Sequence, residues 1–156
     1  MRLSNFRHRQ QRHESDCLVA CCQMVLEYLG IPLRYERLAK RLRAGSAFTP
    51  FGHLRYLETL GLSLTLGEQG DLSIFAPTLE LGLPVIVGVQ TLTWAHWQGE
   101  VTRHAVVVVG IDQVQGVIYI NDPFFPNAPI EMPLLNFEIG WEEKDREYGV
   151  IRLAPA

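Results

Sequence analysis

The hydrophobic pattern near the start of the chain predicts one strongly amphipathic helix. Apolar side chains recur at positions 18, 21, 22, 25 and 29, which is the spacing of a single buried stripe on a helix. Ser15 and Asp16 precede this stripe as good N-cap residues, and Gly30 ends it. The stretch from Gln11 to Gly30 therefore combines a polar approach with a helix that begins near Cys17.

Helical periodicity dominates the first part of the remaining chain, and strand-like patterns dominate the second. Helices are expected over residues 33–43, 49–61, 71–81 and 134–141. In the second of these, Thr49 is the expected N-cap, Pro50 the first helical residue and Gly61 the stop. Alternating or β-branched runs predict strands over residues 62–66, 85–89, 105–109, 117–120 and 148–153. This order predicts an α+β fold, with an N-terminal helical half packed on a C-terminal antiparallel β-sheet.

Composition places the chain among ordinary globular proteins. Its 156 residues, 47% hydrophobic and 20% charged, suit one domain over 1–156 with a self-sufficient core. A net charge of −3 argues against nucleic acid as a partner, and the Arg- and His-rich segment 2–13 is interpreted as a solvated basic end. The chain shows neither a signal peptide nor an apolar stretch long enough to insert into a membrane, which predicts a cytoplasmic protein.

Three cysteines lie close together on the first predicted helix. They suit a reduced compartment better than a disulfide framework, and without CxxC spacing they imply no metal; no cofactor is implied either. Cys21 and Cys22 lie inside the apolar stripe and are interpreted as buried fillers. Cys17 falls in the first turn, where unpaired N–H groups and the helix dipole favour an anion. It is therefore the candidate nucleophile, with a buried filler as the alternative. A carboxylate at Asp16 would oppose a thiolate unless, as an N-cap, it points its charge at backbone donors.

A second candidate group lies on a predicted β-hairpin. Residues 110–116 form a turn between two apolar strands. If the hairpin is symmetric about its centre, Val109 faces Val117 and His104 faces Asp122, with Cβ atoms about 4.5–5.5 Å apart. His104 is then a general base whose ring is oriented by the carboxylate of Asp122. The alternative is a satisfied core or surface histidine and an aspartate that opens a turn.

Cys17, His104 and Asp122 together supply a nucleophile, a base and an orienting group. If the apolar stripe of the first helix docks on the hairpin, His104 lies near the start of that helix. Two other histidines are weaker candidates for the base. His13 has no hairpin partner, and His96 lies among tryptophans in a loop, where we expect an exposed or wall-lining role.

Hydrolysis through a thiol also needs donors for the negative charge on the attacked carbonyl oxygen. The N–H of Cys17 is one, and a side-chain amide shortly before it, Gln10 or Gln11, is a second. Three segments then resemble, in order, those of the bacteriocin-processing (double-glycine leader) cysteine peptidases, cysteine peptidase family 39, and their stand-alone relatives. The segments are QRHESDCLVAC, RHAVVVVGI and INDP, which are similar to Q-x-x-x-x-D-C-x-x-A-C, H-x-V-V-V and D-P, and the resemblance spans roughly the whole chain.

This resemblance implies a papain-like fold and a role for each matching residue. Gln11 would be the oxyanion-hole amide, Cys17 the nucleophile, His104 the base and Asp122 its orienter. Members cut after a Gly-Gly pair in leader peptides, usually as the N-terminal cytoplasmic domain of an ATP-driven exporter. Here Leu18 stands where a glycine or alanine often follows the nucleophile, and no membrane helices or P-loop follow the domain.

The sequence thus predicts a cysteine endopeptidase that cleaves a peptide bond through an acyl-enzyme. Its expected partners are a peptide or protein substrate and a separate membrane exporter. One alternative is an acyl transferase or amidase that uses the same triad with an amine as acceptor. The other is a catalytically silent module that binds leader peptides.

Overall fold

A computed structural model describes residues 1–154 of the chain, so the last two residues of the expected domain, 1–156, lie outside the described part. The helices are α1 (Cys17–Tyr28), α2 (Tyr35–Arg41), α3 (Phe75–Glu80), α4 (Leu134–Glu142) and the 3₁₀ helices η1 (Phe51–Leu60), η2 (Leu72–Ile74) and η3 (Ala95–Trp97). The strands are β1 (Leu62–Gly67), β2 (Val85–Gln90), β3 (Arg103–Asp112), β4 (Val117–Asn121), β5 (Ile130–Pro133) and β6 (Tyr148–Leu153). In this part of the chain, no helix has the length and apolar character needed to cross a membrane.

The strands form a single antiparallel sheet in the order β1-β6-β2-β3-β4-β5. The N-terminus extends it, because the N–H of Leu3 donates to the carbonyl of Val109 at 2.8 Å beyond the end of β2. The expected α+β class with an antiparallel sheet is confirmed. β5, a four-residue edge strand ending in Pro133, has no counterpart among the predicted strands.

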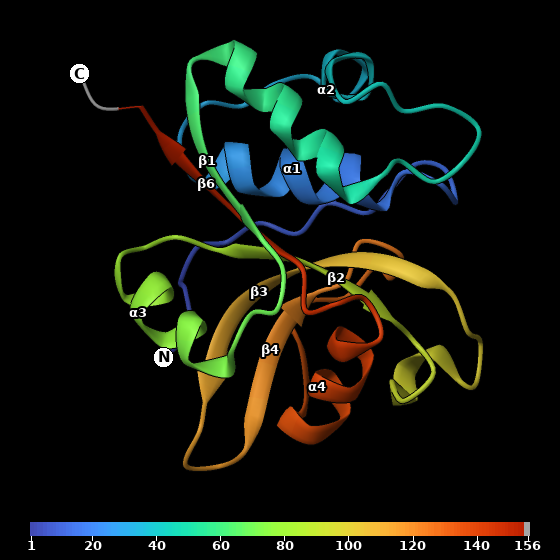
Figure 1. Ribbon diagram of the computed structural model, residues 1–156, viewed down its shortest axis with the longest axis vertical. Coiled ribbons are helices and arrows are strands. Elements are labelled where there is room, and N and C mark those ends of the chain that lie inside the picture. The colour runs from blue at the N-terminus through green and yellow to red at the C-terminus, as the bar shows by residue number, and fades with distance from the viewer. Residues whose placement is uncertain (155–156) are drawn as a thin grey trace.

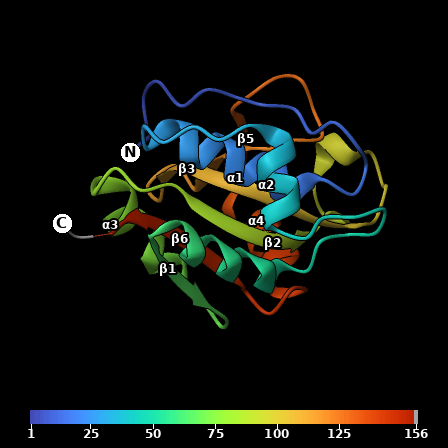
Figure 2. The same cartoon turned by 90° about the horizontal axis from the view of Figure 1, so that it is seen from above.

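Helices cover both faces of this sheet (Figure 1, Figure 2). On one face, the apolar stripe of α1 packs on the odd-numbered side chains of β3, including Val107 and Val109. On the other face, Val106 and Val108 pack with aromatic rings from α3 and α4. Because β3 is buried on both sides, it is a continuous apolar run rather than an alternating one. The second helical layer was not part of the expected two-halves arrangement.

The first helix begins and ends close to the predicted residues. After its last turn, the N–H of Ile31 donates to the carbonyl of Leu26 at 3.0 Å, and that of Gly30 to Glu27 at 3.1 Å. Gly30 has a φ of +83°, which suits glycine. This pair of hydrogen bonds is a Schellman motif, and it closes the helix where the sequence places its stop.

The third predicted helix is present but begins differently. Pro50 occupies the N-cap position in an extended conformation, and the element that follows, η1, is a 3₁₀ helix. Thr49 is not the cap, because its hydroxyl oxygen is buried without a hydrogen-bond partner. Gly61 ends the helix with a φ of +78°, as predicted.

The basic N-terminal segment contacts the rest of the fold, although most of its basic side chains are exposed to solvent, as expected. Leu3 is buried, and the guanidinium of Arg9 donates to both carboxylate oxygens of Glu27 on α1, at 3.0 and 2.9 Å. Arg7 lies 3.3 Å from the same carboxylate. The N–H of Gln11 then donates to the carbonyl of Pro123 at 2.7 Å. The segment before α1 is thereby attached to the loop after β4.

Candidate functional site

Cys17 is the first residue of α1, and its side chain is almost fully buried, with 6% of the residue exposed. As the first helical residue, it has a backbone N–H without an intrahelical acceptor. Cys21 and Cys22, one turn later, are completely buried, and burial raises the pKa of both thiols. These two cysteines therefore fill the core as predicted, while Cys17 lies at its edge.

Asp16 occupies the N-cap position of α1 but makes no side-chain cap hydrogen bond. Its carboxylate instead accepts a hydrogen bond from the hydroxyl of Tyr35 at 2.7 Å. Burial and this hydrogen bond raise the pKa of Tyr35, while the guanidinium of Arg12 lies 4.3 Å from the centre of the Tyr35 ring. The expectation that Asp16 points its charge at the backbone donors of the helix is wrong. Its carboxylate is bound instead by the hydroxyl of Tyr35, the first residue of α2.

The structure brings His104 and Asp122 into direct contact. His104 Nε2 donates to Asp122 Oδ1 at 2.6 Å, and both side chains are buried. Burial opposes a charged imidazole, but the carboxylate of Asp122 and the neighbouring side chain of Cys17 outweigh burial and raise the pKa of His104 to about 9. Burial would also raise the pKa of Asp122, yet the neighbouring donors hold it well below its usual value. The pair is thus an imidazolium and a carboxylate.

The register that produces this contact differs from the predicted one. Val117 pairs with Asp112, not with Val109, and the pairing shifts by one residue between Val108 and Gly110. At this β-bulge, two residues of β3 lie opposite one residue of β4. The pairing of the two strands is therefore offset by one residue across the bulge. Asp122 follows β4 as the diagonal neighbour of His104 on the same face, rather than the residue directly opposite.

The carboxylate of Asp122 accepts four hydrogen bonds. Besides His104, Oδ1 accepts from the N–H of Phe124 at 3.0 Å. Oδ2 accepts from His96 Nε2 at 2.8 Å and from Trp97 Nε1 at 3.0 Å. With Nε2 of His104 used by Asp122, Nδ1 is the ring nitrogen left for the thiol. His96 therefore does not have the exposed or wall-lining role that was expected, because it donates to the carboxylate of Asp122. This contact forms only when η3 packs against the end of β4.

A narrow cavity of about 70 Å³ lies beside the thiol. Cys17 and His104 line it together with Leu18, Phe48, Thr49, Phe51, Gly88, Arg103, Ala105, Lys144 and Glu147. Burial raises the pKa of Glu147, whose side chain lies against the backbone of Gly88: a Cβ at that glycine would overlap it. The charged residues of this wall were missed at the sequence level, where residues 142–147 have the pattern of an ordinary charged loop.

Gln11 lies in the loop before α1, and its amide is engaged within that loop. Its Nε2 donates to the carbonyls of His13 at 2.8 Å and Glu14 at 3.0 Å. Its Oε1 is buried without a partner among the described residues. His13 contributes its backbone carbonyl here. Donation from Gln11 to a substrate oxygen would thus require one of these two bonds to be exchanged.

Comparisons with known proteins identify the family and the fold. The sequence matches the Peptidase_C39 like family over residues 3–148. A crystal structure described as a C39-like peptidase from Bacillus anthracis is similar, with a TM-score of 0.76 and 19% identity, covering 96% of each chain. No curated protein sequence matches the chain.

Two further solved structures share the fold. The peptidase domain of Streptococcus ComA, a bi-functional ABC transporter involved in quorum sensing, has a TM-score of 0.72 and 22% identity, covering 97% of this chain and 100% of that one. A double-glycine-motif protease from an AMS/PCAT transporter, in complex with the leader peptide, has a TM-score of 0.69 and 15% identity, covering 97% and 94%.

Proposed function

Because the chain belongs to the Peptidase_C39 like family, we propose that it is a cysteine endopeptidase that works through an acyl-enzyme. The observation that carries the proposal is the convergence of three side chains. The Cys17 thiol and the His104 ring share one cavity, and His104 is hydrogen-bonded to Asp122 at 2.6 Å. This is the nucleophile, base and orienting acid of a thiol hydrolase.

In the proposed reaction, Cys17 Sγ attacks the carbonyl carbon of the scissile bond as a thiolate, and the His104 imidazolium donates a proton to the leaving amine. The C–N bond breaks and a thioester remains on Cys17. Water then attacks the thioester and the neutral His104 ring accepts a proton from it. The C–S bond breaks, the free acid leaves, and the thiolate of Cys17 is restored beside the His104 imidazolium. Asp122 keeps the ring oriented throughout and stabilises its charged form.

The oxyanion requires two donors in this proposal. The backbone N–H of Cys17 is the first, since helix geometry leaves it without an internal partner. The amide of Gln11 is the second, by exchange of one of its bonds to the loop carbonyls. Removing such a donor typically costs roughly 10²–10³ in turnover, so Gln11→Ala should retain cysteine reactivity but lose most cleavage.

The small cavity supports cleavage after a Gly-Gly pair. Its volume of about 70 Å³ leaves little room beside the thiol for a substrate side chain. One structural neighbour is a double-glycine-motif protease in complex with a leader peptide, and two are parts of transporters. We therefore propose a leader-like peptide as substrate and a separate membrane exporter as partner.

Alkylation by iodoacetamide near pH 6 tests the site without knowledge of the substrate. We expect a single rapid label on Cys17, located by mass spectrometry, and none in Cys17→Ala. Cys22→Ala is the matched control, because that thiol is fully buried and its loss should leave the label in place. Labelling of Cys17 no faster than a free thiol would contradict the proposal.

Peptides containing Gly-Gly, analysed by mass with and without an added amine, then define the reaction. Hydrolytic cuts support the peptidase. Amide products formed only with the amine would instead establish the acyl transferase, and binding without any cut would establish the silent module.

A further inference from the structure

One segment of this acidic protein is strongly basic. Residues 34–59 contain six arginines and lysines and only two glutamates. The segment therefore has a net charge of +4, in a chain whose total net charge is −3. The remainder of the chain is therefore more acidic than the total indicates. Such asymmetry favours an anionic partner at the basic segment.

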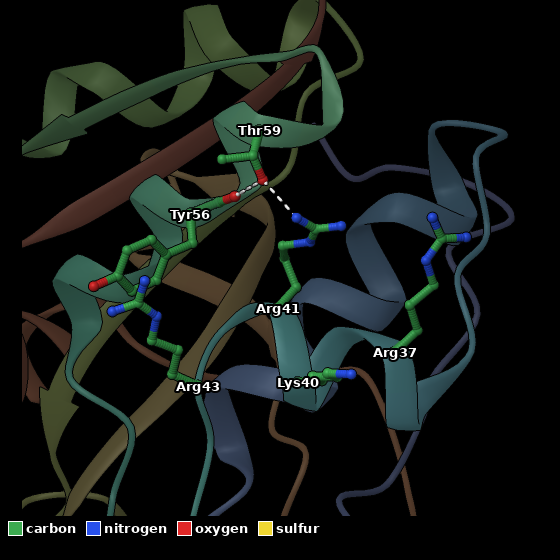
Figure 3. Close-up of a pocket in the computed structure, with 6 residues that line it drawn as sticks. All are labelled: Arg37, Lys40, Arg41, Arg43, Tyr56 and Thr59. Atoms are coloured by element: carbon green, nitrogen blue, oxygen red, sulfur yellow. Dashed lines mark hydrogen bonds between the residues drawn. The ribbon is translucent and has the colours of Figure 1, made fainter.

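Four of these cations surround a surface cavity of about 440 Å³ between α2 and η1 (Figure 3). It is lined by Arg37, Lys40, Arg41, Arg43, Tyr56 and Thr59. Within residues 1–154, no carboxylate lies within 4.0 Å of any of the four cationic groups. The nearby Glu36 and Glu58 instead pair with arginines outside the cavity, Arg12 and Arg55.

Two of the guanidinium groups are held in place by neutral contacts. Arg41 Nη1 donates to the hydroxyl of Thr59 at 3.1 Å, and that hydroxyl donates to the carbonyl of Tyr56 at 2.7 Å. The guanidinium of Arg43 lies 4.2 Å from the centre of the Tyr56 ring. Since a guanidinium carries five N–H donors, both groups retain donors in a fixed fork that matches a carboxylate.

The basic cavity and the candidate active site share one helix. Phe51, the first residue of η1, lines the cavity beside Cys17, whereas Tyr56 and Thr59 line the basic one. Eight residues at a 3₁₀ rise of about 2.0 Å each separate Phe51 from Thr59 by roughly 16 Å. An extended peptide advances about 3.3 Å per residue, so roughly five residues span that distance.

We propose that this basic cavity binds an acidic segment of the peptide substrate, about five residues from the bond that is cut. The proposal rests on the peptidase function proposed above. The cations come from separate side chains spread along α2 and beyond its end, which suits several spaced carboxylates better than one compact phosphate. Arg43 covers one face of the Tyr56 ring and the His53 ring lies 5.0 Å from it, which leaves little stacking surface for a nucleobase.

Fluorescence anisotropy with a fluorescein-labelled hexaglutamate peptide tests the cavity directly, because this probe needs no cleavage. In Arg41→Gln/Arg43→Gln we expect the dissociation constant to rise about 10- to 100-fold, the range for losing charge-assisted hydrogen bonds. Binding should also weaken with added NaCl, and less steeply in this variant.

Arg34→Gln/Arg55→Gln is the matched control, since it removes two charges from the same segment but from outside the cavity. We expect at most a two- to threefold change. Equal weakening in the control, or no binding of hexaglutamate by the wild type, would overturn the proposal. So would displacement of the probe by inorganic phosphate that clearly exceeds the displacement caused by NaCl at the same ionic strength, because the site would then take a compact anion.

Peptides with Gly-Gly and a glutamate pair placed two, five or eight residues away connect the cavity to cleavage. If peptides are cut, we expect the five-residue spacing to give the lowest KM, and the advantage to vanish in Arg41→Gln/Arg43→Gln. A KM independent of spacing would contradict the substrate assignment. If no peptide is cut but hexaglutamate binds as described, the peptidase function fails while the acidic-peptide site remains.

Discussion

At the scale of single residues, most polar contacts of the candidate site converge on Asp122. Four donors, two from η3, one from β3 and one from the loop that follows Asp122, bind its two oxygens, and the carboxylate is fully buried. A buried charge without such partners would be costly, so the donors and the acid depend on one another. His96 is the least expected of these donors. It donates to Oδ2 of Asp122, whereas His104 donates to Oδ1.

His96→Ala should slow alkylation of Cys17 by roughly 10- to 100-fold, the cost of losing one hydrogen bond to a charged group. The effect should pass through the orientation of Asp122 and His104, so turnover should fall with little change in KM. His96→Gln should recover much of the rate, because its amide can donate to the same oxygen. The measurement is the alkylation rate at fixed pH; equal losses in the two variants would contradict a donor role.

At the scale of elements, α4 is held against β2 and the loop that carries His96. The side-chain amide of Asn136 on α4 donates to the backbone carbonyl of Thr93 at 2.9 Å. The backbone carbonyl of Asn136 accepts from Trp94 Nε1 at 3.2 Å. Gly140 permits this approach. A Cβ there would lie 2.5 Å from the carbonyl oxygen of Gln90.

Gly140→Ala should lower the free energy of unfolding by about 1–3 kcal/mol, the usual cost of overpacking. Alanine is a better helix former than glycine by about 1 kcal/mol, but a backbone oxygen cannot move aside as a flexible side chain can. Leu135→Ala, at a position 68% exposed on the same helix, is the control and should change the value by less than about 0.5 kcal/mol. Urea unfolding measures both; a Gly140→Ala protein as stable as the wild type would disprove the close contact.

The β-bulge in β3 also determines the geometry of the candidate site. Below the bulge, Asp112 pairs with Val117, and above it Val107 pairs with Asn121. Without the shift, Asp122 would emerge on the face opposite to His104. One extra residue in a strand thus decides whether base and acid meet.

At the scale of the whole molecule, the sheet gathers segments that are far apart in the chain. The N-terminal arm binds β3 and the loop after β4, α1 packs on β3, and η3 reaches Asp122. The candidate site therefore exists only in the folded chain, and its ion pair contributes to the pH dependence of global stability.

Between pH 6.5 and 8 the free energy of unfolding should fall. The folded pKa of His104, about 9, exceeds the value of about 6.5 in an unfolded chain, so its contribution is complete below pH 6.5 and is lost as the pH rises towards 9. Asp122, with a depressed pKa, contributes above about pH 3.8 and loses its contribution as the pH falls below that value.

Urea unfolding of wild type and His104→Gln at pH 6.5, 7.2 and 8 measures this effect, because the cysteines are the same in both proteins and their ionisation cancels in the difference. The stability difference between the two proteins should shrink steadily across these values. A difference that stays constant or grows would show that the imidazole is not stabilised as a cation.

The sequence by itself determined the elements whose patterns are local. The stripe of α1, its glycine stop and the limits of β6 follow from periodicity and turn chemistry, and the fillers Cys21 and Cys22 follow from their place in the stripe. The α+β class followed from the order of those elements.

Tertiary structure alone decided the hairpin register, the partner of Asp16 and the place of His96. A bulge depends on packing across two strands, Tyr35 lies one helix away from Asp16, and His96 meets Asp122 through a loop contact 26 residues distant. No local sequence pattern predicts these contacts, because hydrogen bonds between remote segments form only after the sheet has brought the segments together. The contact between His104 and Asp122 was predicted as a neighbouring pair, while its diagonal geometry came from the fold.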